Sequence, residues 1–549
     1  MKLLWYFRDK SLRYINWLAP LVLGAFAFLV IAGPRVLYPT NISWLCRGDA
    51  AQHYLGWVFF RNSKLTFPLG LNPDFGMDFA NSVVYSDSIP LLAIPFKLIS
   101  SLLPEPFQYF GLWIFICFVL QAHFGWKLAG LMTESRAVSF LFTGFLVFSP
   151  PMIWRLHAHT SLASHFLILA ALYLVLCQKG ENRWRAWGLL LATTALVHAY
   201  LLALVAMLWM VDLLERKLKK EITTGNFLVE PIVMLTVLGV VCWQAGYFII
   251  GSGVSTGGYG YYRMNLLSIV DSDGWSNFLT DLPGGKGDYE GFNFLGAGGL
   301  LLLATSLICV LRLPAKIHGL VKTRPVLIAA LAATTLFSLS NNVGIATFNL
   351  EYPLPELLVN KFAVFRSSGR MFWVVYYLIL CASMAIIITS LERRFVLLLL
   401  ACALIIQVAD TRSGWEWVSI RLKAKPGSEW LSTLVDPFWS GAARQYKKVK
   451  LLMPSNYSPR WKDLSYFAAN NGLATDAVYL ARIDKEKFDA TRVSGNLCLT
   501  TGIYERDTLY VLDDEAVDEA MKTIDTDRDL FAKIDGLNVL APWWNTRKK

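Results

Sequence analysis

A series of long apolar runs constrains this chain more than any other feature. A transmembrane helix needs about 20 consecutive apolar residues, and most of these runs approach that length. The runs are Trp17–Leu37, Phe107–Leu128, Val138–Trp154, Leu162–Cys177, Trp187–Val211, Phe227–Ile249, Phe294–Val310, Pro325–Leu339, Met371–Ser390 and Phe395–Ala409. Together they predict a polytopic α-helical membrane protein.

The composition agrees with this prediction. Of the 549 residues, 55% are hydrophobic and 17% are charged, and the mean hydropathy is +0.44. Soluble domains contain about 25% charged residues, so an ordinary water-soluble enzyme is excluded, as are a disordered chain and a disulfide-stapled secreted module. The net charge of +11 does not indicate nucleic acid, because most of the excess lies in short loops between the apolar runs.

Charged residues divide the chain into two predicted domains. The segment Thr411–Lys549 carries 21 of the 51 Lys and Arg residues and 19 of the 40 Asp and Glu residues. We therefore expect a membrane domain at residues 1–410, with a long first outer loop at 38–106, and an α/β domain at 411–549. Its expected strands are Lys448–Met453, Ala477–Ile483, Thr508–Leu512 and Leu537–Leu540, and its expected helices are Ser458–Asn470 and Asp514–Ile524.

The basic residues predict the membrane topology. They cluster at the N-terminus and near residues 127–136, 179–185, 216–220, 312–324 and 393–394, and cytoplasmic loops are enriched in Lys and Arg. Both flanks of Trp187–Val211 are basic, so this run is expected to be a hairpin that turns near His198. The result is about 11 spans, a cytoplasmic N-terminus, an uncleaved first helix and a C-terminal domain on the opposite side.

Acidic residues gather on the predicted outer side. Asp49 follows the first span, and Asp87 lies in the segment Tyr85-Ser86-Asp87-Ser88. A carboxylate beside the membrane surface can act as a general base for an incoming hydroxyl, and nearby apolar surface raises its pKa. We therefore predict that Asp49 and Asp87 are catalytic, with Asp74 and Asp78 as weaker candidates. The alternative for each is a helix cap or a solvated charge.

Several outer cations are candidates for binding a phosphate. Arginine pairs bind phosphate in a bidentate manner, and the start of a helix attracts anions; we expect Arg366 and Arg370 to share one helix face at such a start. The full predicted set is Arg155, His159, His165, His198, Arg366 and Arg370. The alternatives are structural hydrogen bonds for the histidines and arginines that reach lipid headgroups.

Metal and nucleotide motifs are scarce. His159 and His165 are six residues apart, which suits zinc poorly, and Asp271-Ser272-Asp273 in the Gly- and Tyr-rich loop Gly251–Gly291 lacks the glutamate that completes a calcium loop. No metal site or cofactor is predicted, although a divalent metal stays open. Cys46 and Cys498 both fall on the predicted outer side, where they can form a disulfide or remain free thiols.

The chain resembles the GT-C superfamily of integral-membrane glycosyltransferases, which use polyprenyl-phosphate sugars. The resemblance rests on Arg47-Gly48-Asp49 after the first span, the long first outer loop, the acidic motif at Asp87 and the outward C-terminal domain. More narrowly, it is similar to bacterial enzymes that add glucose to O-antigen or other surface glycans. Matching patterns are Arg155 with His159 and His165, His198-Ala199-Tyr200, Arg366-Ser367-Ser368-Gly369-Arg370 and Asp535-Gly536-Leu537.

The resemblance implies a function in the bacterial inner membrane. An undecaprenyl-phosphate-linked sugar would place its phosphate near Arg366 and Arg370, with Arg155 as a further candidate. Asp49 would deprotonate or orient the hydroxyl of a glycan acceptor on the periplasmic side. The transfer would be inverting and metal-independent. The C-terminal domain would hold the acceptor, with Trp415, Trp417, Trp439, Trp461, Trp543 and Trp544 as possible stacking surfaces.

Two other functions compete with this one. An O-antigen polymerase or ligase also has many spans and outer arginines. A transporter or flippase for lipid-linked glycans would carry polar residues through the middle of the membrane, whereas here the centres of the apolar runs have few charges. The lipid bilayer, the lipid-linked donor and the glycan acceptor are the expected partners.

Overall fold

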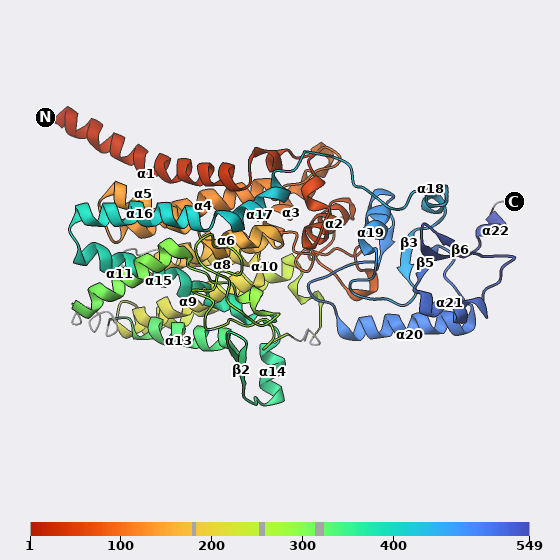
Figure 1. Cartoon of the computed structure of the whole chain (residues 1–549). Coiled ribbons are helices and arrows are strands. Elements are labelled where there is room, and N and C mark those ends of the chain that lie inside the picture. Colours follow the sequence, from red (N-terminus) through yellow and green to blue (C-terminus); the bar gives the residue numbers. More distant parts are fainter. Residues whose placement is uncertain (1, 178–182, 252–257, 313–322, 548–549) are drawn as a thin grey trace. The chain divides into compact units, whose positions relative to one another are not determined.

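The computed structural model describes residues 2–177, 183–251, 258–312 and 323–547 (Figure 1). Parts of two predicted basic clusters, at 178–182 and 313–322, and residues 252–257 of the predicted outer loop lie outside the described residues. The chain divides into two compact units. The helical unit comprises Met1–Tyr38, Tyr109–Leu238 and Ser255–Lys425, and the sheet unit comprises Pro39–Gln108, Gly239–Val254 and Pro426–Lys549.

Long α-helices build the helical unit. They are α1 (Lys2–Ile31), α4 (Phe110–Gly130), α5 (Arg136–Val147), α6 (Pro150–Trp154), α7 (Phe166–Leu176), α8 (Arg183–Ala195), α9 (Ala199–Leu218), α10 (Thr224–Ala245), α11 (Gly296–Arg312), α13 (Pro325–Leu339), α14 (Glu356–Phe362), α15 (Trp373–Ser390), α16 (Arg393–Asp410) and α17 (Arg412–Leu422). Helix α4 packs against α1, α5 and α7, and α11 packs against α15 and α16 (Figure 1).

Short elements join these helices. The 3-10 turns are η1 (Pro34–Leu37), η5 (Arg155–His157), η6 (Thr160–Ala163), η8 (Asp288–Gly291) and η9 (Ser368–Phe372). A small antiparallel hairpin pairs β1 (Asn342–Ile345) with β2 (Phe348–Glu351). The turns η5, η8 and η9 carry Arg155, Glu290 and Arg370, respectively.

The number of membrane spans differs from the prediction. Among the described residues, four helices are long and apolar enough to cross a membrane: Phe110–Gly130, Arg136–His157, Thr224–Ala245 and Ser368–Ser390. A fifth span results if α16 and α17, bent by 54°, count as one. Four more apolar stretches have 10–17 described residues, namely Asn16–Ile31 within the longer α1, Thr160–Leu176, Gly296–Arg312 and Pro325–Leu339, and the last three are shorter than the roughly 20 residues that a span needs. The helices indicate membrane association, but about 11 spans are not supported.

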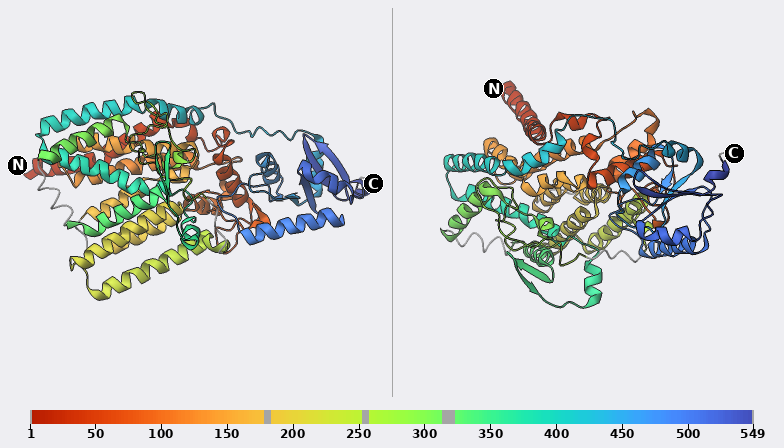
Figure 2. Two further views of the ribbon diagram at one scale, coloured as in Figure 1. Left: turned by 60° about the horizontal axis from the view of Figure 1, so that its bottom comes forward. Right: turned by 45° about the vertical axis from the view of Figure 1, so that its right-hand side comes forward.

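The run Trp187–Val211 forms two helices, as its basic flanks predict. Helix α8 ends at Ala195, and α9 begins at Ala199 and packs back against it. His198 precedes α9, and its side chain accepts a hydrogen bond from the backbone N–H of Tyr200. Helix α9 contains Asp212, Glu215 and Arg216, so it fails as a simple apolar span. Its neighbour α10 returns beside it (Figure 2).

A five-stranded sheet forms the centre of the sheet unit. Its strand order is β4-β3-β5-β7-β6, where β3 (Lys448–Leu451), β4 (Ala474–Thr475) and β5 (Thr508–Leu512) are parallel, and β6 (Leu530–Ile534) and β7 (Leu537–Ala541) are antiparallel to their neighbours. Its helices are α2 (Asp49–Asn62), α3 (Pro90–Leu98), α18 (Pro437–Gln445), α19 (Trp461–Asn470), α20 (Lys485–Thr501), α21 (Asp514–Met521) and α22 (Trp544–Arg547). Short turns η2 (Ser43–Leu45), η3 (Met77–Phe79), η4 (Ser100–Leu102) and η7 (Tyr247–Ile249) complete it.

Two residues close the hairpin between β6 and β7. Asp535 and Gly536 both have positive φ, at 47° and 81°, as a two-residue turn with a matching twist requires. The Asp535 carboxylate also accepts hydrogen bonds from the backbone N–H groups of Val435 and Asp436. The Asp535-Gly536-Leu537 pattern therefore has a structural task in this fold.

One predicted strand is wrong. Residues Ala477–Ile483 have no regular secondary structure, because their backbone groups bond outside the sheet. Leu480 N–H donates to the side chain of Asn456, and Ala481 N–H donates to the carbonyl of Tyr85. The other three predicted strands and both predicted helices of this domain are present with small shifts at their ends.

The first long loop folds together with the C-terminal sheet. Phe75 forms a parallel bridge with Thr475, next to the end of β4, and Thr475 N–H donates to the carbonyl of Asp74. Asp78 forms a 3.0 Å ion pair with Lys450 on β3. The compact unit thus groups residues 39–108 with 426–549, whereas the sequence divides the chain near residue 410. Within the same unit Cys46 and Cys498 carry free thiols.

Candidate functional site

An acidic cluster forms at the start of α2 in the sheet unit. Asp49 is the first residue of this helix and is half-buried. His53 follows one turn later, so both side chains lie on one face of α2. His53 is completely buried, and its Nε2 atom lies 3.9 Å from Oδ2 of Asp87, whose side chain is 12% exposed. The fold therefore brings Asp87 to His53, which lies one helical turn after Asp49.

Serine side chains fix the Asp87 turn against α2. The hydroxyls of Ser86 and Ser88 lie 2.9 Å apart, and the Ser88 hydroxyl donates to the carbonyl of His53 at 2.8 Å. Gly56 makes this approach possible, because a Cβ atom there would lie 2.4 Å from the Ser86 side chain. The residues of the Tyr85-Ser86-Asp87-Ser88 motif thus hold the carboxylate in place.

The backbone around Asp87 is strained. Asp87 and Ile89 both have φ of 53°, in the left-handed region that a β-branched residue such as isoleucine strongly disfavours. Strain of this kind persists only where surrounding contacts hold it, and it often marks functional sites. The arrangement offers an imidazole and two carboxylates, which can accept, hold or return a proton.

His53 and Asp87 are also residue types that bind metals. Their nearest side-chain atoms are close enough to share a cation. The same imidazole and carboxylate therefore suit either a proton-transfer role or a share in a metal site, for which zinc takes three or four protein ligands.

In the helical unit, Glu290 joins two of the predicted arginines. Its Oε2 atom accepts a 2.7 Å bond from Arg155 and a 2.9 Å bond from Arg370, and its Oε1 atom accepts a second bond from Arg370. All three side chains are at least 90% buried. The Arg155 guanidinium also lies over the rings of Trp154 and Trp373, and that of Arg370 over Tyr200. Two guanidinium groups and one carboxylate leave a net charge of +1.

Glycines explain how these side chains meet. A Cβ atom on Gly369 would lie 2.5 Å from the Cα atom of Gly291, so only two glycines let η9 approach η8 this closely. The contact places Arg370 directly beside Glu290. The Gly369 of the Arg366–Arg370 motif is therefore needed for close backbone packing.

The prediction that Arg366 and Arg370 share a helix face is wrong. Arg366 precedes the 3-10 turn η9, and α15 begins only at Trp373; residues four apart do not align in a turn with three residues per turn. Arg366 instead donates to the Tyr262 hydroxyl at 2.7 Å, with its guanidinium 4.5 Å from the centre of that ring. It is only partly buried, so it is the more accessible of the two.

His198 contributes through its neighbour Tyr200. The Tyr200 hydroxyl accepts a hydrogen bond from the backbone N–H of Ser367 at 2.8 Å, which ties the start of α9 to the arginine motif. The ring of Tyr200 lies under Arg370. The predicted His198-Ala199-Tyr200 turn therefore lies beside Arg370 and holds it in position.

The remaining histidines lie on either side of η6. His165 is fully buried, its Nδ1 atom is 2.8 Å from the Tyr377 hydroxyl, and its ring packs against Trp373. This is a structural contact of the kind that the sequence allowed. His159 is partly exposed, and its backbone N–H donates to the carbonyl of Arg155.

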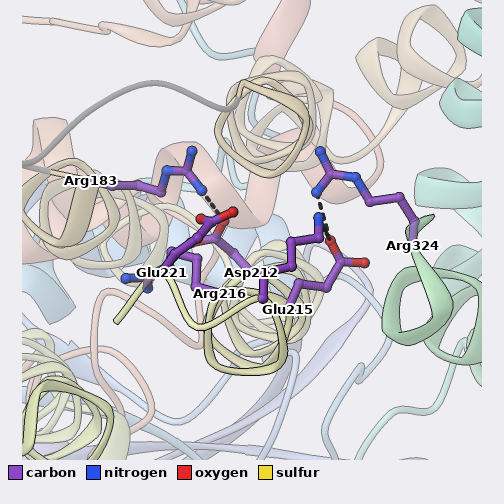
Figure 3. A pocket seen from close by; sticks show the side chains of 7 residues that line it. Arg183, Asp212, Glu215, Arg216, Glu221 and Arg324 are labelled. Carbon is purple, nitrogen blue, oxygen red and sulfur yellow. Dashed lines mark hydrogen bonds and ion pairs between the residues drawn. The ribbon is translucent and has the colours of Figure 1, made fainter. Parts of the chain in front are cut away.

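A second network of buried charges lines a small pocket in the helical unit (Figure 3). Asp212 pairs with Arg183 and Arg216, and Glu215 pairs with Arg324 and Lys219. These pairs connect α8, α9 and the start of α13. Asp212 and Glu215 each have two basic partners from these elements, so the ion pairs hold the helices together.

Sequence reasoning missed Glu290, Tyr262 and His53 as parts of these clusters, and it named Tyr200 only within the His198-Ala199-Tyr200 pattern. His53 lies within the Asp49 segment, four residues after the acid, and this spacing is a usable signal. Glu290 had no comparable signal, because its partners are far away in the sequence. Asp74 and Asp78, the weaker candidates, bind the sheet through the bonds described above.

Comparison with known proteins gives a family but no activity. Residues 21–412 match the family model described as a domain of unknown function, DUF6311, and residues 438–542 match the model of the DUF6311 C-terminal domain. No curated protein matches the chain.

Proposed function

The chain belongs to the DUF6311 family, and we propose that it is a membrane glycosyltransferase. It moves a sugar, with glucose as the first choice, from an undecaprenyl-phosphate carrier to a surface glycan such as O-antigen. The reaction takes place on the periplasmic side of the bacterial inner membrane, with a cytoplasmic N-terminus and a periplasmic C-terminal domain. The candidate membrane spans support a lipid-linked substrate.

The observation that carries this proposal is the contact of Asp87 with His53, one helical turn after Asp49 on α2. A hydroxyl nucleophile gains from a carboxylate that is held in place and partly shielded from water. Asp87 meets this description through its serine clamp and its contact with His53. Asp49 opens the helix that carries His53, where the N-terminal dipole favours a negative charge.

The reaction uses these groups in one displacement. Asp49 takes the proton from the acceptor hydroxyl as the oxygen attacks the anomeric carbon of the donor sugar. The bond between that carbon and the phosphate oxygen breaks, and undecaprenyl phosphate leaves with the bonding electron pair. Asp87, with His53, orients the acceptor. Attack from the face opposite the phosphate inverts the anomeric configuration.

Arginines of the helical unit suit the donor phosphate. The monoester that leaves and the diester that enters are both anions, and bidentate guanidinium groups recognise them well. Arg366 is partly exposed and bonds to a neutral tyrosine. The cluster of Arg155, Glu290 and Arg370 carries a net positive charge in the low-dielectric interior of the protein. Its electric field therefore attracts the anionic phosphate.

A transfer assay tests the proposal. Full-length protein in lipid nanodiscs is incubated with radiolabelled undecaprenyl-phosphate glucose and purified lipopolysaccharide. We expect label in the polysaccharide, and about a 100-fold or greater loss of rate in Asp49→Asn and Asp87→Asn, because general bases contribute roughly 10²–10⁴-fold. Asp489→Asn, an exposed aspartate on α20, is the matched control. Absence of transfer, or unchanged rates in both variants, contradicts the proposal.

A further inference from the structure

A second cavity lies at one edge of the sheet in the sheet unit. It has a volume of about 300 Å³, at the lower end of the range for small-molecule sites. Three segments that are distant in the sequence surround it. The residues that matter here are Pro454, Ser455, Phe488, Arg492, Asp513 and Glu515.

The sheet topology explains why a cavity forms there. Strands β3 and β5 are parallel neighbours, so the chain leaves both at the same edge, toward Pro454 after β3 and toward Asp513 after β5. Ligands of α/β folds bind in crevices outside the carboxyl ends of such strands. Helix α20 covers one side, and Gly495 allows its close approach, because a Cβ atom there would lie 2.0 Å from the carbonyl oxygen of Leu452.

The chemistry of the lining indicates the class of ligand. Phe488 presents a half-buried aromatic ring, which also contacts Phe79 of the first loop. Arg492 is a donor, Asp513 and Glu515 are acceptors, and all three are exposed. Asp513 precedes α21, but its side chain does not cap that helix. Its carboxylate is therefore available to a ligand.

These groups match a neutral carbohydrate. A sugar ring packs an apolar C–H face on an aromatic ring, and its hydroxyls both donate to carboxylates and accept from a guanidinium. Two carboxylates against one guanidinium disfavour an anion such as a phosphate, and the guanidinium disfavours a metal ion. Among the described residues, tryptophan does not contribute to the lining of this cavity. Of the six predicted stacking residues, Trp415, Trp439, Trp461 and Trp544 are buried, whereas Trp417 is exposed and Trp543 is half-buried.

We propose that this cavity binds one residue of a neutral glycan chain, and that it holds the acceptor of the transfer reaction. The second half of this inference rests on the proposed function, whereas the binding itself does not. In this arrangement the acceptor contacts the residues that follow β3 and β5, and it also contacts α20.

Binding can be measured without any catalysis. Full-length protein in nanodiscs, labelled with a fluorophore, is applied to an array of neutral and uronic-acid-containing oligosaccharides. We expect binding to neutral glycans and about a tenfold or greater loss in Asp513→Asn and Arg492→Ala, since each removes a charged hydrogen-bonding partner. The matched controls are Asp518→Asn on α21 and Lys487→Ala on α20, both exposed and outside the cavity lining. Because all four side chains are exposed, folding is expected to be unchanged, and thermal melting checks it.

Each outcome has a defined meaning. Neutral binding that the cavity variants weaken and the controls retain supports the inference. Binding to acidic glycans only, binding that no variant changes, or no retained glycan overturns it. In the transfer assay, the cavity variants should raise the KM for the acceptor and leave kcat unchanged. If glycans bind in the cavity while Asp49→Asn and Asp87→Asn transfer like the wild type, the proposed function fails and the binding site stands.

Discussion

The Glu290 carboxylate offsets the positive charge of two arginines that come from distant parts of the chain. Burial alone raises the pKa of Glu290, but the guanidinium groups of Arg370 and Arg155 outweigh it and hold that pKa well below its usual range. The carboxylate is therefore charged throughout the physiological range. Its contribution to stability is present above the pKa of an unfolded glutamate and is lost only as the pH falls through the lower pKa of the folded state.

Removing this charge should destabilise the helical unit. Glu290→Gln leaves two buried guanidinium groups without a counter-charge, and breaking a buried pair in this way costs about 3–5 kcal/mol. We expect a lower unfolding midpoint in nanodiscs, measured by differential scanning fluorimetry. Glu356→Gln, an exposed glutamate of α14, should melt like the wild type. Equal unfolding midpoints for Glu290→Gln and Glu356→Gln would show that the charge of Glu290 does not stabilise the two buried arginines.

The buried carboxyl group of Asp476 in the sheet unit predicts that stability changes with pH in the direction opposite to the effect of Glu290. Burial raises its pKa to about 7, although the N–H group of Leu451 and the nearby Lys450 lower it. The folded state then binds a proton more tightly than the unfolded state, so the free energy of unfolding falls as the pH rises from about 4 to 7.

Asp476→Asn removes this titration and keeps the oxygen that accepts from Leu451. We expect the variant to be more stable than the wild type at pH 8 by up to about 4 kcal/mol, because the pKa rises from 3.8 to about 7 and one pKa unit corresponds to about 1.4 kcal/mol. The difference should shrink toward pH 5. Melting curves between pH 5 and 8 check this, and a constant difference across that range would contradict it.

Only part of the residue-scale picture could be predicted from the sequence. The sequence predicts Asp87, Arg155 and Arg370 as outer charges, and in the structure Asp87 lies beside His53 while Arg155 and Arg370 share Glu290. Pattern reasoning identifies charges at unusual places. It cannot pair Arg155 with Glu290, because that contact depends on how separate helices pack.

At the scale of elements, helix α4 shows how small residues set the packing. A Cβ atom on Gly111 would lie 1.7 Å from the carbonyl oxygen of Val36, so α4 meets the chain after α1 at backbone distance. Among the described residues, Gly130 at the other end of the same helix has no neighbour within 4 Å of such an atom.

Alanine at these two glycines should have opposite effects. Gly111→Ala forces backbone apart and is expected to cost about 3 kcal/mol or more, at or beyond the usual range for overpacking. Gly130→Ala should be neutral or stabilise by up to about 1 kcal/mol, because it reduces the entropy of the unfolded chain. Paired thermal melts distinguish them, and a tolerated Gly111→Ala would contradict the close approach.

Element prediction succeeded where local patterns decide. The apolar runs became helices, and Thr508–Leu512 became β5 with its predicted bounds. It failed where contacts with distant residues decide the local structure. Ala477–Ile483 has the composition of a strand, but its backbone forms hydrogen bonds with Asn456 and Tyr85 instead of with a neighbouring strand. The span count failed for a related reason: α7 has 11 residues, and length in a sequence run does not give the length of the helix.

At the scale of the whole molecule, sequence order and compact units differ. The first long loop belongs to the sheet unit through Phe75 and Thr475, Asp78 and Lys450, and the stacked rings of Tyr54 and Trp430. The acids Asp49 and Asp87 therefore share a unit with the proposed glycan cavity. No local signal predicts this grouping, because it pairs segments separated by hundreds of residues.

The grouping predicts how a shortened chain behaves. Deleting residues 426–549 removes every C-terminal partner of the loop, including the hydrogen bonds at Thr475 and the ion pair of Lys450. We expect amide hydrogen exchange to become much faster across residues 70–88, because local opening then costs little free energy. Helices α4 and α15, which lie wholly in the helical unit, should keep their protection and serve as the internal control. If residues 70–88 stay protected in the shortened chain, the loop folds on its own, and Asp87 does not depend on the sheet for its position.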